Sequence, residues 1–134
     1  MYWRYPFTEY TVYDGDTIKL PDIDLGFRVH LHGYSVRLEG VDTPERYTDA
    51  GKAVTEAVIW WCDQWSMLVL GPSKLGKYSK RIIGAVWGRG EDQSLSEWLL
   101  EHRMANPYDG GTKEKWTTES LQRAEDSARR CLND

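Results

Sequence analysis

Short runs of alternating apolar and polar residues fill the first part of the chain, and this alternation is typical of β-strands with one buried face. Such runs extend from Phe7 to Tyr13 and from Thr17 to Leu20, with Asp14-Gly15 between them. Because glycine tolerates a positive φ, an Asp-Gly pair at this point predicts a tight hairpin turn. We expect Asp16 to open the second strand.

A longer strand is predicted from Arg28 to Val41, and its alternation slips by one residue. Val29 and Leu31 lie on one face, whereas Val36 and the apolar residues around it lie on the other. Gly33 stands at the slip. We therefore expect a β-bulge at Gly33, a device that re-aims strands beside functional sites and at barrel bends.

Three segments of the chain carry helix signals. Apolar residues recur every three or four positions from Ala50 to Trp65, and again from Leu121 to Leu132. Between these segments, Ser94 and Glu97 have the spacing of a capping box, which predicts the start of a short helix. We therefore expect two longer helices and one short helix.

Two later apolar runs, Met67 to Leu70 and Ile82 to Trp87, bring the predicted strands to five. Five strands with three helices fit an α+β fold built on a five-stranded OB-like β-barrel. At 134 residues, without repeats or long linkers, the chain fits one domain over residues 1–134. No apolar run has the form of a signal peptide or a membrane span, so we expect a monomeric cytoplasmic protein without membrane contact.

The formal net charge of −4 at pH 7 argues mildly against a protein that coats nucleic acid, because Lys and Arg contacts to phosphate dominate such binding. The charge is unevenly distributed, however. The segment from Gly71 to Gly90 contains five basic residues and no acidic residue. Such a segment is either a solvated loop or a phosphate-binding surface, and the sequence leaves both interpretations open.

Two short segments carry the residues best suited to catalysis. Asp16 follows the predicted turn, and Asp42, Thr43 and Glu45 follow the strand that contains Arg37. Two carboxylates and the Thr43 carbonyl would supply the oxygen ligands that Ca²⁺ or Mg²⁺ prefers. Glu45 would activate a water, and Arg37 would bind a phosphoryl group.

Each segment also has a simpler explanation. Asp14-Gly15-Asp16 on its own is most often a turn. Thr43 and Pro44 on their own fit the N-cap and the first position of a helix. The conjunction of both acidic segments with Arg37 favours a catalytic site, because neither a turn nor a cap requires it.

These residues resemble the motifs of the staphylococcal (micrococcal) nuclease family. Gly15-Asp16-Thr17 and the segment from Arg37 to Glu45 match the family's motifs in residue type and spacing. The segment from Lys77 to Trp87 resembles the family's second arginine segment, and Ser94 to Leu100 resembles the helix that follows it. The resemblance spans Phe7 to Leu132 and is strongest to the short members found in phages and prophages.

The resemblance implies a nuclease that hydrolyses DNA and RNA with little sequence preference and leaves 3′-phosphate ends. It selects Ca²⁺ as the cofactor, with Asp16, Asp42 and the Thr43 carbonyl as ligands. It also implies that Arg37 is a catalytic phosphate clamp and that Glu45 acts on the attacking water, as a true base or by orienting it.

The family's second catalytic arginine falls where this chain departs from the pattern. The family usually has Tyr-Gly-Arg, whereas here one residue more, and no glycine, separates Tyr78 from Arg81. Register with the following strand and the bidentate fork of arginine favour Arg81, with Lys80 as the alternative. Lys77 and Tyr78 would contact phosphate or base, and Tyr108 would either stack on a base or be a simple turn residue.

A second class of function stays open at this point. An OB-like barrel can also bind nucleic acid or protein without catalysis, and some relatives of this fold serve as interaction modules. The presence of Arg37, Asp42 and Glu45 favours the enzyme, whereas the acidic net charge and the irregular Arg81 segment favour the module.

Overall fold

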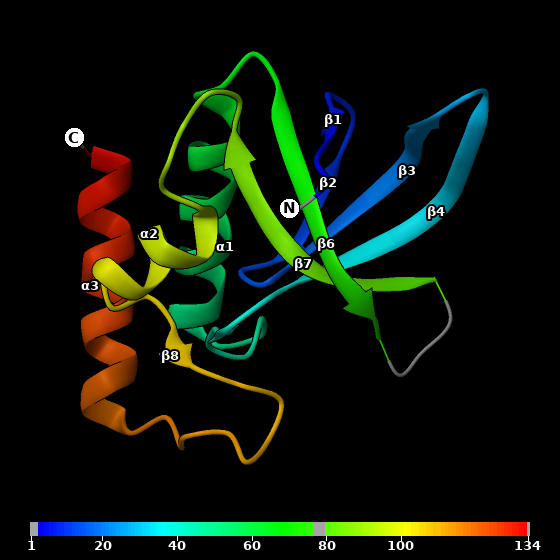
Figure 1. Cartoon of the computed structure of the whole chain (residues 1–134). Helices are drawn as coiled ribbons and strands as arrows, with labels where there is room; N and C mark the ends of the chain where they lie inside the picture. The colour runs from blue at the N-terminus through cyan, green and yellow to red at the C-terminus, as the bar shows by residue number, and fades with distance from the viewer. Residues whose placement is uncertain (1–2, 77–79, 134) are drawn as a thin grey trace.

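The structure is a computed structural model that describes residues 3–76 and 80–133. Within these residues the chain forms three helices and eight strands (Figure 1). The helices are α1 (Asp49–Asp63), α2 (Leu95–Glu101) and α3 (Thr118–Asn133). The strands are β1 (Tyr5–Phe7), β2 (Thr11–Asp14), β3 (Thr17–Gly26), β4 (Val29–Leu38), β5 (Val41–Asp42), β6 (Leu68–Leu75), β7 (Arg81–Gly88) and β8 (Asn106–Pro107).

Six of these strands form one mixed sheet in the order β1-β6-β7-β4-β3-β2. Neighbouring strands are antiparallel, except β4 and β7, which are parallel. The sheet curls into a half-barrel with β1 and β2 at its two edges, and β5 and β8 form a separate two-stranded sheet. The α+β class is therefore confirmed. The five-stranded OB-like barrel expected from the sequence is wrong, because the main sheet has six strands and remains a half-barrel.

The first predicted strand divides into two. Residues expected to form one strand from Phe7 to Tyr13 contribute instead to β1 and β2. β1 pairs with β6, where Tyr5 lies opposite Leu70, while β2 pairs with β3, where Thr11 lies opposite Lys19. The two pieces therefore lie at opposite edges of the sheet, and the half-barrel stays open between them.

The prediction of a β-bulge at Gly33 is also wrong. The register of β3 against β4 runs unbroken from Leu20 opposite Tyr34 to Asp22 opposite His32, and it shifts only near the hairpin tip. Gly33 instead has a positive φ of 70°, which glycine adopts without strain. Near Gly33 the buried side chains of β3 and of β4 both change from one face of the sheet to the other, while the two strands stay in register. The slip in the sequence pattern therefore marks a bend shared by both strands.

The helices gather on one side of the sheet, and the β3–β4 hairpin extends to the other (Figure 1). α1 packs against β2 and α3. Its predicted apolar face is buried, and Trp61 on that face packs against Trp98 of α2 with ring centroids 6.3 Å apart. None of the helices in the described part of the chain is long and apolar enough to cross a membrane.

The start of α1 decides between two interpretations of the Asp-Thr-Pro-Glu segment. The N-cap is Thr48, whose hydroxyl oxygen accepts a hydrogen bond from the Gly51 N–H at 2.9 Å. The alternative in which Thr43 caps the helix and Pro44 begins it is therefore wrong. Both residues are buried in an irregular segment before the helix, and the same segment carries Glu45.

Candidate active site

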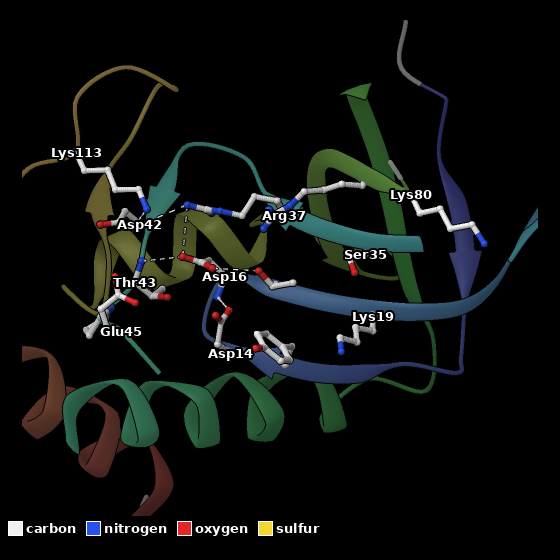
Figure 2. A pocket seen from close by; sticks show the side chains of 14 residues that line it. Asp14, Asp16, Lys19, Ser35, Arg37, Asp42, Thr43, Glu45, Lys80 and Lys113 are labelled. Atoms are coloured by element: carbon white, nitrogen blue, oxygen red, sulfur yellow. Dashed lines mark hydrogen bonds and ion pairs between the residues drawn. The ribbon is translucent and has the colours of Figure 1, made fainter. Parts of the chain in front are cut away.

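An open pocket of about 470 Å³ lies where the β2–β3 turn, the end of β4, β5 and the start of β7 meet (Figure 2). Four carboxylates and five cationic side chains line it, so the pocket has no excess of negative charge although the whole chain carries −4. The lining includes the predicted metal ligands and catalytic residues, namely Asp16, Arg37, Asp42, Thr43, Glu45 and Arg81.

Asp16 and Asp42 come from separate segments and converge on one guanidinium. Asp16 Oδ2 lies 3.5 Å and Asp42 Oδ1 lies 3.9 Å from Arg37 Nη2. Both aspartates are buried, with 8% and 7% of their surface exposed. The Thr43 N–H donates to Asp16 Oδ2 at 3.1 Å, and the Thr17 hydroxyl donates to Oδ1 at 3.2 Å. The Asp16 side chain thus ties the β2–β3 turn to the end of β5.

Arg37 is held rigidly from its other side. Its Nη1 donates to the Leu38 carbonyl at 3.0 Å and to the Val41 carbonyl at 2.8 Å. Val36 and Leu38 point into the core, so alternation along β4 directs Arg37 toward the pocket. The guanidinium is therefore positioned by backbone oxygens before it meets either carboxylate.

Asp14 adds a further acidic group to this end of the pocket. Its Oδ1 accepts the Asp16 N–H at 3.1 Å, which fixes the turn. Burial, and then the negative charge of Asp16, raise the pKa of Asp14 to about 6. Such crowding of carboxylates is unfavourable on its own and is relieved by a bound cation.

Glu45 lies between β5 and α1 and presents an exposed side chain to the pocket. Its carbonyl oxygen accepts the Thr48 N–H at 3.0 Å and the Thr48 hydroxyl at 2.7 Å. These hydrogen bonds hold the Glu45 backbone against the first turn of α1. Gly51 makes this close approach possible, because a Cβ at that position would overlap the Glu45 carbonyl oxygen.

The substitution Gly51→Ala is expected to destabilise the protein although alanine is the better helix former. A Cβ would also lie 2.6 Å from the Glu45 carbonyl carbon and 3.0 Å from Arg46 Cα, and backbone cannot yield as a side chain does. Overpacking of this kind costs about 1–3 kcal/mol, against a helix-propensity gain of at most ~1 kcal/mol. Urea unfolding measures the change in the free energy of unfolding, with Lys52→Ala at the next, exposed position as control. A raised midpoint for Gly51→Ala would contradict the close packing of Gly51 against the Glu45 carbonyl.

Arg81 and Lys80 both line the pocket, at the start of β7. Arg81 Nε is buried and has no hydrogen-bond partner among the residues that the structure describes. A buried donor without an acceptor is costly, and a phosphate oxygen would supply the acceptor. Figure 2 shows the Lys80 ammonium directed away from Asp16 and Asp42. These observations favour Arg81 over Lys80 for the role of second phosphate clamp that the resemblance implies.

The predicted substrate contacts are placed only in part. Lys77 and Tyr78 lie outside the described residues. Tyr108 is half-buried beside the pocket, with its ring centre 5.7 Å from the Arg37 guanidinium carbon and 5.5 Å from Lys113 Nζ. The small sheet holds it there, because β8 pairs with β5 immediately before Tyr108.

Two residues that the sequence did not single out surround Asp42. Lys113 Nζ lies 3.3 Å from Asp42 Oδ1, and the Trp116 indole N–H donates to Oδ2 at 3.3 Å. Both belong to the segment between β8 and α3, which therefore covers one side of the carboxylate. The only signal in the sequence was a tryptophan isolated in a polar stretch, which is unusual unless the ring finds a partner.

A second cluster of titratable groups lies away from the pocket, on the β3–β4 hairpin. His30 Nδ1 lies 3.0 Å from both oxygens of Asp22, and His32 Nδ1 lies 3.2 Å from one of them. The hydrogen bond to Asp22 raises the pKa of His30. We interpret the cluster as an exposed ion pair that becomes stronger when His30 is protonated.

The acidic end of the pocket suits a hard divalent cation. Asp16 and Asp42 offer carboxylate oxygens, and Thr43 offers a backbone carbonyl. No set of three or more Asp, Glu, His or Cys side chains in residues 3–76 and 80–133 is grouped to hold a metal ion. A cation would therefore take further ligands from water or substrate, as Ca²⁺ does when it completes a shell of roughly six to eight oxygens.

No family model matches the chain, and no curated protein matches it significantly. The resemblance to the staphylococcal nuclease family therefore rests on the sequence motifs alone.

Proposed function

We propose that the chain is a Ca²⁺-dependent nuclease of the staphylococcal nuclease type, which hydrolyses phosphodiester bonds in DNA and RNA with little sequence preference. The observation that supports this most strongly is the convergence of Asp16 and Asp42 on Arg37 in a pocket that Glu45 and Arg81 also line. A turn and a helix cap would not require buried carboxylates from two segments around one guanidinium.

The acidic end of the pocket, formed by Asp14, Asp16, Asp42 and Glu45, would activate the substrate and the water. Asp16, Asp42 and the Thr43 carbonyl would hold Ca²⁺, which polarises a phosphodiester oxygen when it is bound. Glu45 faces the pocket from an exposed position that water reaches freely. Its carboxylate orients the attacking water or takes its proton.

The two arginines act on the phosphoryl group. Arg81 donates to the phosphoryl oxygens. Arg37, whose Nη1 stays on the Leu38 and Val41 carbonyls, offers its Nη2 to the same charge as it builds up. The attacking water oxygen forms a bond to phosphorus while the bond from phosphorus to the 5′ oxygen breaks. That oxygen takes up a proton, so the products are a 5′-hydroxyl and a 3′-phosphate end.

The decisive experiment is a cleavage assay with a metal series. Denatured DNA and RNA are expected to be cut in Ca²⁺ and to stay intact in excess chelator. The ends should block polymerase extension until a phosphatase removes the 3′-phosphate. Failure to cut either substrate in Ca²⁺, Mg²⁺ or Mn²⁺ would refute the proposal.

The second candidate is a non-catalytic module that binds nucleic acid or protein. The net charge of −4 favours the protein-binding form of this candidate, because such a charge is unusual for a protein that binds a polyanion. This candidate predicts binding of oligonucleotides, or of no nucleic acid at all, without cleavage in any metal.

Ca²⁺ binding has a readout that does not depend on cleavage. At about 100 times its dissociation constant, Ca²⁺ should raise the free energy of unfolding by roughly 2.7 kcal/mol. Asp42→Asn keeps the shape of the side chain but removes its charge, so most of this stabilisation should be lost. Asp92→Asn, at an exposed site outside the pocket, is the control. A wild-type melting temperature that does not respond to Ca²⁺ would contradict the site.

Lys113→Met is expected to tighten Ca²⁺ binding. The Lys113 ammonium lies 3.3 Å from Asp42 Oδ1 and competes with a cation for the same oxygen. Because the Lys113 side chain is 53% exposed, its ion pair is worth at most ~1 kcal/mol, and Ca²⁺ affinity should rise by about two- to fivefold. Calorimetric titration measures this, with the exposed Lys115→Met as control. Weaker binding would show that Lys113 assists the cation instead.

A further inference from the structure

One end of the pocket carries a cluster that the proposed mechanism does not use. Tyr13 and Lys19 line the pocket there. Lys19 Nζ lies 4.5 Å, and the Arg46 guanidinium carbon 4.2 Å, from the centre of the Tyr13 ring. Arg46 Nη1 also donates to the Tyr13 hydroxyl at 3.2 Å. A single aromatic ring thus gathers two cations at the pocket edge.

A β-bulge aims this ring. β2 pairs with β3 at Val12–Ile18 and at Asp14–Thr17, so Tyr13 is the additional residue on its strand. Bulges commonly re-aim side chains next to active sites. Tyr13 is 39% exposed, so the irregularity in the backbone does not serve to fill the core. It directs an aromatic side chain to the pocket immediately before the acidic turn.

The cluster continues the pocket in one direction. Figure 2 shows Lys19, Ser35 and Lys80 together on one side of the acidic residues, with Lys113 on the opposite side. Lys19 lies opposite Ser35 in the β3–β4 pair, so their side chains share one face of the sheet. A nucleic-acid strand with its scissile phosphate at the carboxylates would therefore pass its next nucleotide over Lys19 and Tyr13.

We propose that Tyr13, Lys19 and Arg46 form a nucleotide subsite for single-stranded nucleic acid. The phosphate next to the cleaved one pairs with Lys19 and Arg46, and the attached base stacks on the Tyr13 ring. Cation–π contacts at exposed positions are weak, so a phosphate draws both cations from the ring and leaves its face to the base.

This inference rests on the proposed function and adds to it a binding site for the neighbouring nucleotide. A base that is paired in a duplex cannot stack on a side chain, so the subsite selects unpaired strands. It also makes affinity depend on length, because a mononucleotide at the acidic end does not reach the Tyr13 ring.

The test compares a mononucleotide with a single-stranded oligonucleotide of roughly 8 nucleotides, a typical length for such grooves. Binding is measured by fluorescence anisotropy or competition in Ca²⁺, with every variant built on Glu45→Gln so that the probe stays intact. Tyr13→Leu should weaken oligonucleotide binding by roughly 5- to 100-fold and leave mononucleotide binding unchanged. Tyr13→Phe, which keeps the ring, should bind like the parent.

A salt series distinguishes the contribution of the Lys19 charge to binding from that of the Tyr13 ring. Lys19→Met should weaken oligonucleotide binding and reduce the slope of log affinity against log salt by about 0.7, since one phosphate contact is lost. Tyr13→Leu should leave the slope unchanged. The controls are Tyr47→Leu, at an exposed tyrosine outside the pocket, and Lys52→Met, at an exposed lysine of α1.

The outcomes distinguish the two proposals. If the wild-type protein cleaves but Tyr13→Leu and Lys19→Met bind the oligonucleotide as their controls do, the subsite is wrong and the nuclease stands. If the wild-type protein neither binds nor cleaves nucleic acid, both proposals fail. Equal losses for the mononucleotide and the oligonucleotide would also overturn the subsite, because they would place Tyr13 and Lys19 in the acidic end itself.

Discussion

Replacing Glu45 by glutamine is expected to lower kcat for DNA cleavage by about 100- to 10,000-fold, the range that a positioned general base contributes. Glutamine keeps the size of the side chain but cannot accept a proton from the attacking water. Because the Glu45 side chain is exposed and the segment is held through its backbone, the fold should be unaffected. Single-turnover cleavage in saturating Ca²⁺ measures the effect.

Two further measurements identify the cause of this loss. Ca²⁺ affinity and oligonucleotide affinity should both stay near the wild-type values, because the carboxylates that would hold the cation are Asp16 and Asp42. Glu56→Gln, at an exposed position of α1, provides the matched control. If Glu45→Gln instead lost Ca²⁺ binding while a higher Ca²⁺ concentration restored the rate, Glu45 would be a ligand and not a base.

The helices could be predicted from the sequence because their signals are local. The apolar face of α1 repeats every three or four residues, and all its predicted members from Ala50 to Trp61 are buried. The capping box of Ser94 and Glu97 is present in both directions at the start of α2. Such contacts join residues three or four positions apart, and a single window of sequence contains them.

The sheet was predicted less well because its pairing is not local. No residue between Phe7 and Tyr13 indicates that the predicted strand is interrupted there. The interruption allows β1 to pair with β6, more than sixty residues later in the sequence. The parallel pair of β4 and β7 is equally remote in sequence. Strand pattern identifies a buried face, but it does not choose the partner strand, so a five-stranded OB-like barrel was expected where a six-stranded half-barrel forms.

The candidate site shows the same difference between local motifs, which the sequence reveals, and distant contacts, which it does not. Asp16, Arg37, Asp42 and Glu45 were found because each stands in a short motif. Lys113 and Trp116 were missed because their relation to Asp42 exists only in three dimensions, with Trp116 standing 74 positions after that aspartate. The segment between β8 and α3 carries no motif, and only its folding back over β5 brings it to the pocket.

Replacing Arg37 by alanine is expected to affect stability and catalysis together, and Ca²⁺ should separate the two effects. Without Ca²⁺, removal of a guanidinium that is only 12% exposed leaves Asp16 without its cation and Asp42 with only the exposed Lys113, and should cost roughly 3 kcal/mol of unfolding free energy. Added Ca²⁺ should restore much of this loss by replacing the missing positive charge. The cleavage rate should still fall by about 100- to 1,000-fold, as on loss of a preorganised donor to the transition state.

Urea unfolding with and without Ca²⁺ tests this, with Arg89→Ala, at an exposed arginine outside the pocket, as control. Arg37→Lys refines it, because a lysine keeps the charge near the carboxylates but cannot also donate to the Leu38 and Val41 carbonyls. If Arg37→Ala lost the same stability with and without Ca²⁺, the guanidinium would act mainly through those two carbonyls. The expected coupling between Arg37 and the cation site would then be refuted, because Ca²⁺ would bind the wild-type protein and the variant equally well.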